Sequence, residues 1–233
     1  MITLTTVAAT GLFSYSWLMI ALPALAAAIL LVFGRILDAS GHWLAVAAVA
    51  ASFVVALVLF IQLLGADPEA RSVAVPLYEW IHTPSWTIAA GLQIDQLSIL
   101  FALLITGVGG VIHVYSVGYM AHDERRRRFF AYLNLFIAAM LTLVLADNYL
   151  VLFVGWEGVG LASYLLIGFW QHKPSAAAAA KKAFVMNRVG DLGMTFAVMA
   201  MLALFGSSAF ADVNAGAAKL DPFWATAIGL FLL

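Results

Sequence analysis

Long apolar runs separated by short polar segments follow one another along nearly the whole chain. A run of about 20 apolar residues is long enough to cross the hydrocarbon core of a bilayer as a helix. A further run at residues 223–233 is too short to cross and predicts only part of a seventh span. The six longer runs predict membrane-spanning helices at residues 15–33, 42–64, 97–119, 129–146, 149–170 and 183–205.

One connection, residues 65–96, is much longer than the others. Aromatic and β-branched residues flank its Thr83-Pro84-Ser85 segment, a pattern that favours a β-hairpin near residues 73–95. The expected fold class is therefore an all-α polytopic membrane protein. It has six transmembrane helices, a partial seventh, and a short β-hairpin on the outer surface between helices 2 and 3. Because the last run is short, we expect the sequence to be the N-terminal portion of a longer protein.

Composition supports the membrane assignment and removes several kinds of site. Hydrophobic residues make up 65% of the chain and charged residues 10%, both far from the values of soluble domains. The chain has no cysteine, which excludes disulfides, thiol catalysis, iron–sulfur ligation and thiolate zinc sites on it. A net charge of -1 gives no sign of nucleic-acid binding, and the N-terminus lacks the basic region of a cleaved signal peptide.

Basic residues are divided unequally between the two sides of the predicted bundle. The opposite side has only Arg71 and Lys219, whereas the connections after spans one, three and five contain eight. Because Lys and Arg accumulate on the cytoplasmic side, we expect the N-terminus outside. We interpret the four consecutive arginines as a topology signal in a solvated loop, with a lipid- or partner-binding patch as the alternative. The eight basic residues are Arg35, Arg125, Arg126, Arg127, Arg128, Lys173, Lys181 and Lys182.

Glu157 interrupts the otherwise apolar run at residues 149–170. A charged residue at the centre of a membrane helix costs roughly 2.5–3.5 kcal/mol on insertion scales, so it is usually paired, protonated or functional. Arg188 and Asp191 lie three residues apart in the sixth span and can neutralise each other. At 1.5 Å per residue from the span ends, both carboxylates lie roughly 12 Å deep, near the membrane midplane.

These three charged residues predict a site for moving protons or cations. A buried carboxylate changes its charge state when a cation approaches or withdraws. Gly155, Gly158 and Gly160 flank the acid and leave room for close helix approach and for water. The alternative is structural, with Glu157 and Arg188 only holding two helices together.

Several other polar residues are further candidates or have simpler explanations. His113 lies in the third span and is either a hydrogen-bonded packing residue or a member of the ion path. Lys181 continues the charged face of the sixth helix and Lys182 follows it, so both are further candidates for proton translocation. The sequence contains no metal-ligand cluster, no histidine pair spaced for haem and no phosphate-binding glycine loop.

Five segments carry a resemblance to a known family. They are GWEGVGLASYLLIGF at 155–169, AFVMNRVGDL at 183–192, HVYSVGYMA at 113–121, LYEW at 77–80 and DQLSI at 95–99. Together they resemble the chain L type of antiporter-like subunit in respiratory complex I, the proton-pumping NADH–quinone oxidoreductase. The similarity runs over most of the chain, and the WEGVG form at 156–160 is its most specific part.

This resemblance implies two inverted five-helix repeats, the first of which begins at the predicted fourth span. The chain would then divide into residues 1–128, with three helices and the hairpin, and residues 129–233, the start of the first repeat. It also implies that Glu157 pairs with a lysine on a broken helix seven, just beyond Leu233, and helps to gate a half-channel. Arg188 and Asp191 match the charged helix-six pair that tunes this ion pair.

The resemblance further implies a proton-translocating subunit without redox chemistry of its own. FMN, iron–sulfur clusters and quinone are expected on partner subunits, and neighbouring antiporter-like subunits and the lipid bilayer are the expected partners. The alanine-rich composition favours a bacterial plasma membrane. Two alternatives stay open: a subunit of an Mrp-type cation/proton antiporter, and a structural scaffold half without its own ion path. Carboxylates can carry either H⁺ or Na⁺.

Overall fold

The computed structural model describes residues 7–83 and 86–232 and has six helices long and apolar enough to cross a membrane. The six predicted spans are confirmed, with differences at their ends: α4 begins three residues earlier, α5 ends three residues earlier, and α6 begins nine residues earlier. A 3₁₀ turn, η1 (Gly11–Tyr15), precedes the first helix and belongs to the same span. The six helices are α1 (Leu18–Val32), α2 (Gly41–Gly65), α3 (Gln96–Tyr119), α4 (Arg126–Leu145), α5 (Tyr149–Ile167) and α6 (Pro174–Phe205).

α6 is longer than predicted because its first turns are strongly helix-forming without being apolar throughout. Pro174 occupies the first helical turn, where its missing N–H is not needed, and five alanines follow at 176–180. Lys181 and Lys182 interrupt the apolar pattern but not the helix. At 1.5 Å per residue, the 32 residues of α6 extend about 48 Å, well beyond a hydrocarbon core of about 30 Å.

The predicted hairpin is confirmed as an antiparallel pair, β2 (Ser72–His82) and β3 (Thr87–Asp95). Pro84 and Ser85 of the predicted turn lie outside the described residues. The sheet has a third strand that the sequence pattern does not predict, β1 (Val7–Ala8), which pairs in parallel with β2. Short 3₁₀ turns, η2 (Gly34–Leu37) and η3 (Pro68–Ala70), lie in the connections on either side of α2.

Two shorter helices follow α6. The first, α7 (Phe210–Ala217), has eight residues and is not predicted by the search for apolar runs of about 20 residues. The second, α8 (Pro222–Leu232), is an apolar helix at the position of the predicted partial span, whose last residue, Leu233, lies outside the described part of the chain.

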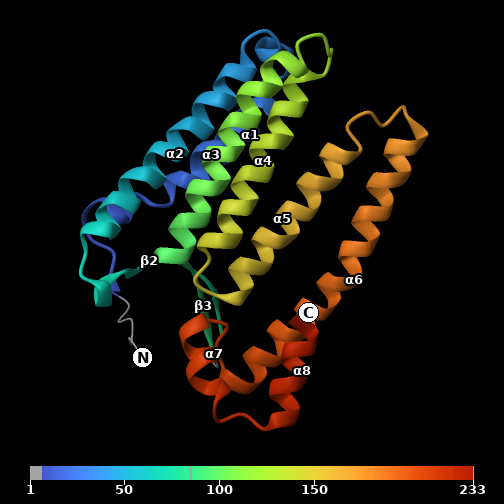
Figure 1. Ribbon diagram of the computed structural model, residues 1–233. Helices are drawn as coiled ribbons and strands as arrows, with labels where there is room; N and C mark the ends of the chain where they lie inside the picture. Colours follow the sequence, from blue (N-terminus) through green and yellow to red (C-terminus); the bar gives the residue numbers. More distant parts are fainter. Residues whose placement is uncertain (1–6, 84–85, 233) are drawn as a thin grey trace.

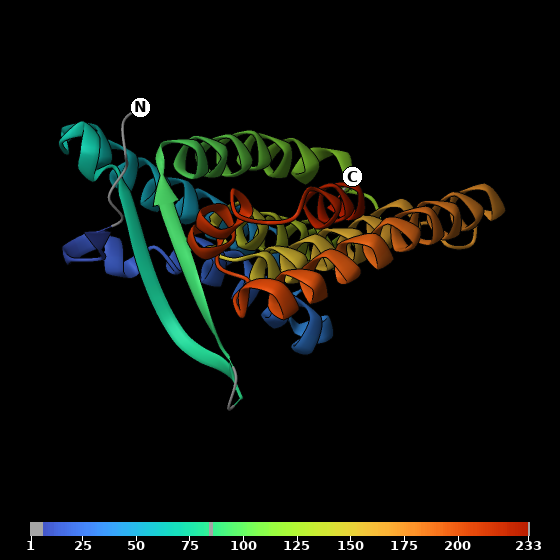
Figure 2. The same ribbon diagram turned by 90° about the horizontal axis from the view of Figure 1, so that it is seen from below.

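The helices pack in the order in which they occur along the second half of the chain. Helices α1 to α4 form one group, α5 packs against α4, α6 against α5, and α8 against α6 (Figure 1). The α3–α4 connection and the α5–α6 connection lie at one end, which we call the arginine-loop end (Figure 1). The expectation that all four arginines lie in a solvated loop is wrong, because Arg126, Arg127 and Arg128 already form the first turn of α4 and only Arg125 precedes it. The sheet, α7 and α8 lie at the opposite hairpin end, where β2 and β3 run side by side across the helix ends (Figure 2).

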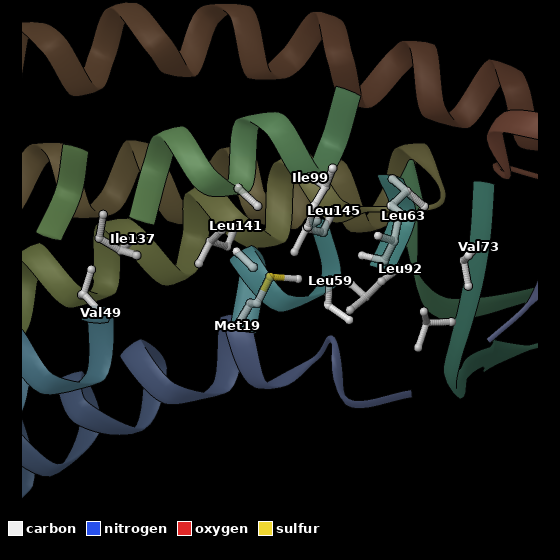
Figure 3. Close-up of a cluster of buried hydrophobic side chains, with 14 residues drawn as sticks. Met19, Val49, Leu59, Leu63, Val73, Leu92, Ile99, Ile137, Leu141 and Leu145 are labelled. Carbon is white, nitrogen blue, oxygen red and sulfur yellow. The ribbon is translucent and has the colours of Figure 1, made fainter. Parts of the chain in front are cut away.

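The main hydrophobic core joins the hairpin to the first four helices. Its side chains come from α1 to α4 and from both long strands, and they are almost completely buried. The hairpin is therefore fixed to the bundle by apolar packing and is not a free surface loop. Ten of these residues are labelled in Figure 3: Met19, Val49, Leu59, Leu63, Val73, Leu92, Ile99, Ile137, Leu141 and Leu145.

The hairpin also positions the starts of two helices. Asp95, its last residue, caps α3 by accepting hydrogen bonds from the backbone N–H groups of Leu97 and Ser98, at 3.0 and 2.8 Å. Asn148 caps α5 with its side-chain oxygen and donates its amide to the carbonyl of Ala89 in β3, at 2.9 Å. The start of α5 is thus tied directly to the sheet.

α4 and α5 approach each other closely through two glycines. A Cβ atom on Gly155 would lie 2.5 Å from the backbone nitrogen of Leu143, and one on Gly158 would lie 2.9 Å from the Cβ of Ala139. Gly160 faces open space. Two of the three glycines that flank Glu157 therefore serve close helix packing, as their small size predicts.

Gly155→Ala is expected to destabilise the protein because the added methyl meets backbone atoms, which cannot move aside independently of α4. Overpacking of this kind costs about 1–3 kcal/mol. Thermal unfolding of the complete protein in detergent should show a lowered midpoint. The matched control is Gly160→Ala, on the same helix and without a neighbour within 4 Å. Equal midpoints for the two variants would contradict the close α4–α5 contact.

Asp147, between α4 and α5, is a partly buried carboxylic acid at the hairpin end. It accepts a hydrogen bond from Asn148 Nδ2 at 2.6 Å, and its carboxylate fills the space beside Gly91. Burial raises the pKa of the Asp147 carboxyl above its ordinary value, and hydrogen bonds from Asn148 and the backbone only partly oppose this.

This raised pKa predicts a pH dependence of stability. Between the ordinary aspartate pKa of about 3.9 and the raised value, the folded state binds more protons than the unfolded state. The contribution of Asp147 to stability is therefore complete below that window and is lost as the pH rises through it. Asp147→Asn should remove this part of the pH dependence, measured as the thermal midpoint from about pH 4 upward.

The control for this measurement is Asp67→Asn, at an exposed acid in another connection at the hairpin end. It should keep the pH dependence of the parent protein. If Asp147→Asn keeps it as well, burial of Asp147 does not govern this part of the stability.

Candidate functional site

Three charged side chains meet between α5 and α6. Arg188 Nη1 lies 2.5 Å from Glu157 Oε1 and 3.7 Å from Asp191 Oδ2. The sequence suggests mutual neutralisation of Arg188 and Asp191 on one helix, but the closer partner of the guanidinium is Glu157 on the other helix. Arg188 therefore bridges the two carboxylates and joins α5 to α6.

Trp156 is a fourth member of this cluster, which sequence reasoning does not include among the site residues. Its indole Nε1–H donates to Asp191 Oδ1 at 2.9 Å. Asp191 is only 6% exposed, so this donor and Arg188 supply its side-chain contacts in a buried position. A signal was present in the sequence, because an indole N–H in an apolar run needs an acceptor at similar depth.

The depth of the cluster follows from the helix starts. Glu157 lies eight residues from Tyr149, the first residue of α5, which is roughly 12 Å along the helix. Asp191 is seventeen residues from the start of α6 because that helix begins at Pro174, earlier than predicted. The direct contacts nevertheless place both carboxylates at one level of the bundle.

The charges in this cluster do not balance. Two carboxylates face one guanidinium, so the group carries one excess negative charge when both acids are ionised. Low-dielectric surroundings make an uncompensated charge costly, and the Trp156 N–H offsets only part of it. One of the two carboxylates is therefore left without a full positive charge of its own.

Aromatic rings extend from this cluster toward the arginine-loop end. The guanidinium of Arg188 lies over the ring of Phe184, 4.9 Å from its centroid, and Phe184 contacts Tyr164 with 5.4 Å between ring centroids. Lys181 lies beyond these rings. Within residues 7–83 and 86–232, neither Lys181 nor Lys182 forms a salt bridge with the cluster.

His113 lies in a different part of the bundle, completely buried between α3 and α4. Its Nδ1 is 2.7 Å from the carbonyl oxygen of Gly109, and its Nε2 is 3.0 Å from Asn134 Nδ2. The amide nitrogen can only donate, so this geometry fits a neutral ring that donates from Nδ1 and accepts at Nε2. The structure thus brings Glu157, Arg188 and Asp191 together and leaves His113, Lys181 and Lys182 outside their direct contacts.

Metal ligation is not supported by the described part of the chain. Across its two ranges, no three His, Asp or Glu side chains are grouped so that they could hold a metal ion.

Two protein-family models match the chain. The one described as NADH-ubiquinone oxidoreductase (complex I), chain 5 N-terminus, matches residues 80–130. The one described as NADH:quinone oxidoreductase/Mrp antiporter, TM, matches residues 146–233, which include the whole charged cluster.

Solved structures share the fold. A chain of the membrane-bound sulfane sulfur reductase, an archaeal respiratory membrane complex, matches with a TM-score of 0.80 at 19% identity, over 94% of this chain and 43% of that one. A chain of the Mrp complex from Dietzia sp. DQ12-45-1b matches with a TM-score of 0.77 at 25% identity, over 93% of this chain and 23% of that one.

A curated relative matches nearly the whole chain. NADH-quinone oxidoreductase subunit L of Mycobacterium tuberculosis is 57% identical over 219 residues, which are 94% of this chain. The matched segment is 35% of the length of that subunit, so the chain spans about a third of its relative. The family-model matches agree with this similarity: the chain belongs to the family of antiporter-like membrane subunits of NADH-quinone oxidoreductase represented by subunit L.

Proposed function

We propose that the chain takes part in proton translocation by NADH-quinone oxidoreductase, through Glu157, Arg188 and Asp191. The observation that supports this is the pairing of two carboxylates with one guanidinium at the level of the membrane interior. The excess negative charge attracts a proton, and movement of the guanidinium between the acids changes which of them holds it. Such a site can link a conformational change elsewhere to uptake and release of a proton.

The position of α8 fits a further cation at this site. The carbonyl oxygen of Phe231 in α8 lies close to Gly193 of α6, so that a Cβ atom added to Gly193 would be 2.8 Å from this oxygen. Gly193 is two residues from Asp191. The family resemblance implies a lysine that follows this segment and pairs with Glu157. We propose that this lysine competes with Arg188 for the glutamate, so that the two cations set its charge state in turn.

The proposal extends to the setting of the chain. Residues 1–128 form an N-terminal unit and residues 129–233 begin the first antiporter-like repeat. The arginine-loop end faces the cytoplasm of a bacterium and the N-terminus lies outside. The neighbours are other membrane subunits of the complex, and FMN, iron–sulfur clusters and quinone belong to partner subunits. His113, Lys181 and Lys182 act as secondary members of the path toward the arginine-loop end.

A second candidate is a subunit of an Mrp-type cation/proton antiporter, favoured by the match to the Mrp complex with a TM-score of 0.77. Sequence identity separates the two candidates, since it is 25% to that chain and 57% to subunit L. A pumping activity that depends on NADH oxidation is the property that only the first candidate has.

Glu157→Gln in the complete complex is expected to abolish most proton pumping because the amide keeps the shape of the acid but removes its charge. Pumping should be measured in vesicles, per NADH oxidised, together with the amount of assembled complex. The control is Glu124→Gln, which changes an exposed acid in the α3–α4 connection. Unchanged pumping and turnover in Glu157→Gln would leave the scaffold role as the remaining explanation.

Trp156→Phe is expected to impair coupled turnover while sparing assembly. It removes the N–H donor to Asp191 but keeps an aromatic ring, and a hydrogen bond to a charged group contributes about 1.5–3 kcal/mol. Coupled activity should fall about tenfold, which corresponds to about 1.4 kcal/mol.

Trp170→Phe provides a matched control for this variant. Trp170 also donates through its indole, to Asp123 Oδ2 at 2.9 Å, but outside the charged cluster. Loss of activity in both variants, or loss of assembled complex in Trp156→Phe alone, would speak for a purely structural role of the indole hydrogen bond.

A further inference from the structure

A polar cavity opens at the arginine-loop end, between α4, α5 and α6, apart from the charged cluster. Its volume is about 280 Å³. Three cationic side chains line it, together with two tyrosines and a glutamine, and no acidic residue does so. These polar lining residues are Arg125, Arg128, Lys181, Tyr132, Tyr164 and Gln171.

None of these three cations forms a salt bridge in the described part of the chain, and the Nη2 of Arg125 lies 3.3 Å from the Nδ1 of His172. The described salt bridges use Arg127 with Asp38, and Arg188 with the two acids of the cluster. The nearby Asp123 accepts instead from the Trp170 indole and from the backbone N–H of Arg125. Three positive charges around one hollow repel one another, so an anion in the hollow would stabilise them.

The remaining wall of the cavity is apolar. Leu165 and Phe169 of the α5 end line it, and the guanidinium of Arg125 lies 5.3 Å from the centre of the Phe169 ring. A free inorganic anion would make no favourable contact with these apolar side chains. A phospholipid has a phosphate for the cations and acyl chains for the apolar wall. Basic pockets between membrane helices on the cytoplasmic side are suited to acidic lipid headgroups.

The depth of the cavity agrees with a headgroup. α6 exceeds the hydrocarbon core by about 18 Å, and Lys181 lies in its second helical turn. Lys173 covers the ring of Trp170 at 4.8 Å at the same end, and Trp and Lys concentrate at the membrane–water interface. The three cations therefore lie near the level at which lipid phosphates occur.

We propose that this cavity binds the phosphate of an acidic glycerophospholipid from the leaflet at the arginine-loop end, with Arg125, Arg128 and Lys181 as its ligands. The bound lipid would join α4, α5 and α6 at the arginine-loop end, where the described residues form no ion pair between these helices. The arginine run is then more than a topology signal, because two of its four members share one anion. Lys181 is also a secondary member of the proposed proton path, so the lipid proposal is judged by lipid retention and not by pumping.

The test compares the complete complex with its Arg128→Gln/Lys181→Gln variant. Both are reconstituted in nanodiscs that contain phosphatidylglycerol and phosphatidylcholine, and native mass spectrometry measures the lipids retained after release. The parent should retain phosphatidylglycerol in preference to phosphatidylcholine, and the variant should bind it on the order of tenfold more weakly. Lys173→Gln/Lys219→Gln removes the same charge outside the cavity and should behave as the parent.

Several results would overturn the proposal. Equal phosphatidylglycerol retention in parent and variant would do so, as would equal retention of phosphatidylcholine by the parent. Displacement of the lipid by inorganic phosphate alone would identify a free-anion site instead. Glu157→Gln should retain the lipid even where pumping is lost, which separates this proposal from the proton path.

A second measurement applies if the double variant does not assemble. A photoreactive phosphatidylglycerol added to the delipidated parent complex should crosslink to the ends of α4, α5 and α6 at the arginine loop. Crosslinks confined to other parts of the complex would overturn the proposal.

Discussion

The backbone contact between Gly155 and Leu143 fixes the rotation of α5, and the arrangement of the charged cluster depends on it. Gly155 and Gly158 face α4. The residues next to them in sequence therefore project from other sides of α5. Trp156 and Glu157 lie between these glycines and thereby reach α6. A larger residue at 155 would push α5 away from α4 and alter the distance over which Glu157 meets Arg188.

The cluster combines two roles that are usually considered separately. As a structural contact, it holds α5 and α6 together through one guanidinium and one indole, both shared with buried or half-buried acids. As an ionic site, it holds one more negative charge than positive charge. A balanced pair would only connect the helices, whereas here a second carboxylate shares the same guanidinium.

Much of this arrangement can be predicted from the sequence, and the features that cannot be predicted have physical reasons as well. The length of the apolar runs predicts the spans because a helix needs about 20 apolar residues to cross the hydrocarbon core. Glu157 is identified because a charged residue in such a run is costly and therefore rare. The early start of α6 is hidden because Lys181 and Lys182 break the apolar pattern without breaking the helix. The Trp156–Asp191 hydrogen bond and the two-residue β1 depend on packing between distant segments, which no local pattern records.

The short strand β1 has a consequence for how the chain enters the membrane. Val7 and Ala8 pair with Val73 and Ala74, and residues 9–72 between them contain two complete spans. Two crossings return the chain to the side from which it started, so the insertion of both α1 and α2 places the two paired segments on the same side of the membrane. If one of the two helices inserted without the other, the two segments would lie on opposite faces of the bilayer. The β1–β2 pair therefore cannot form when only one of these two helices has been inserted.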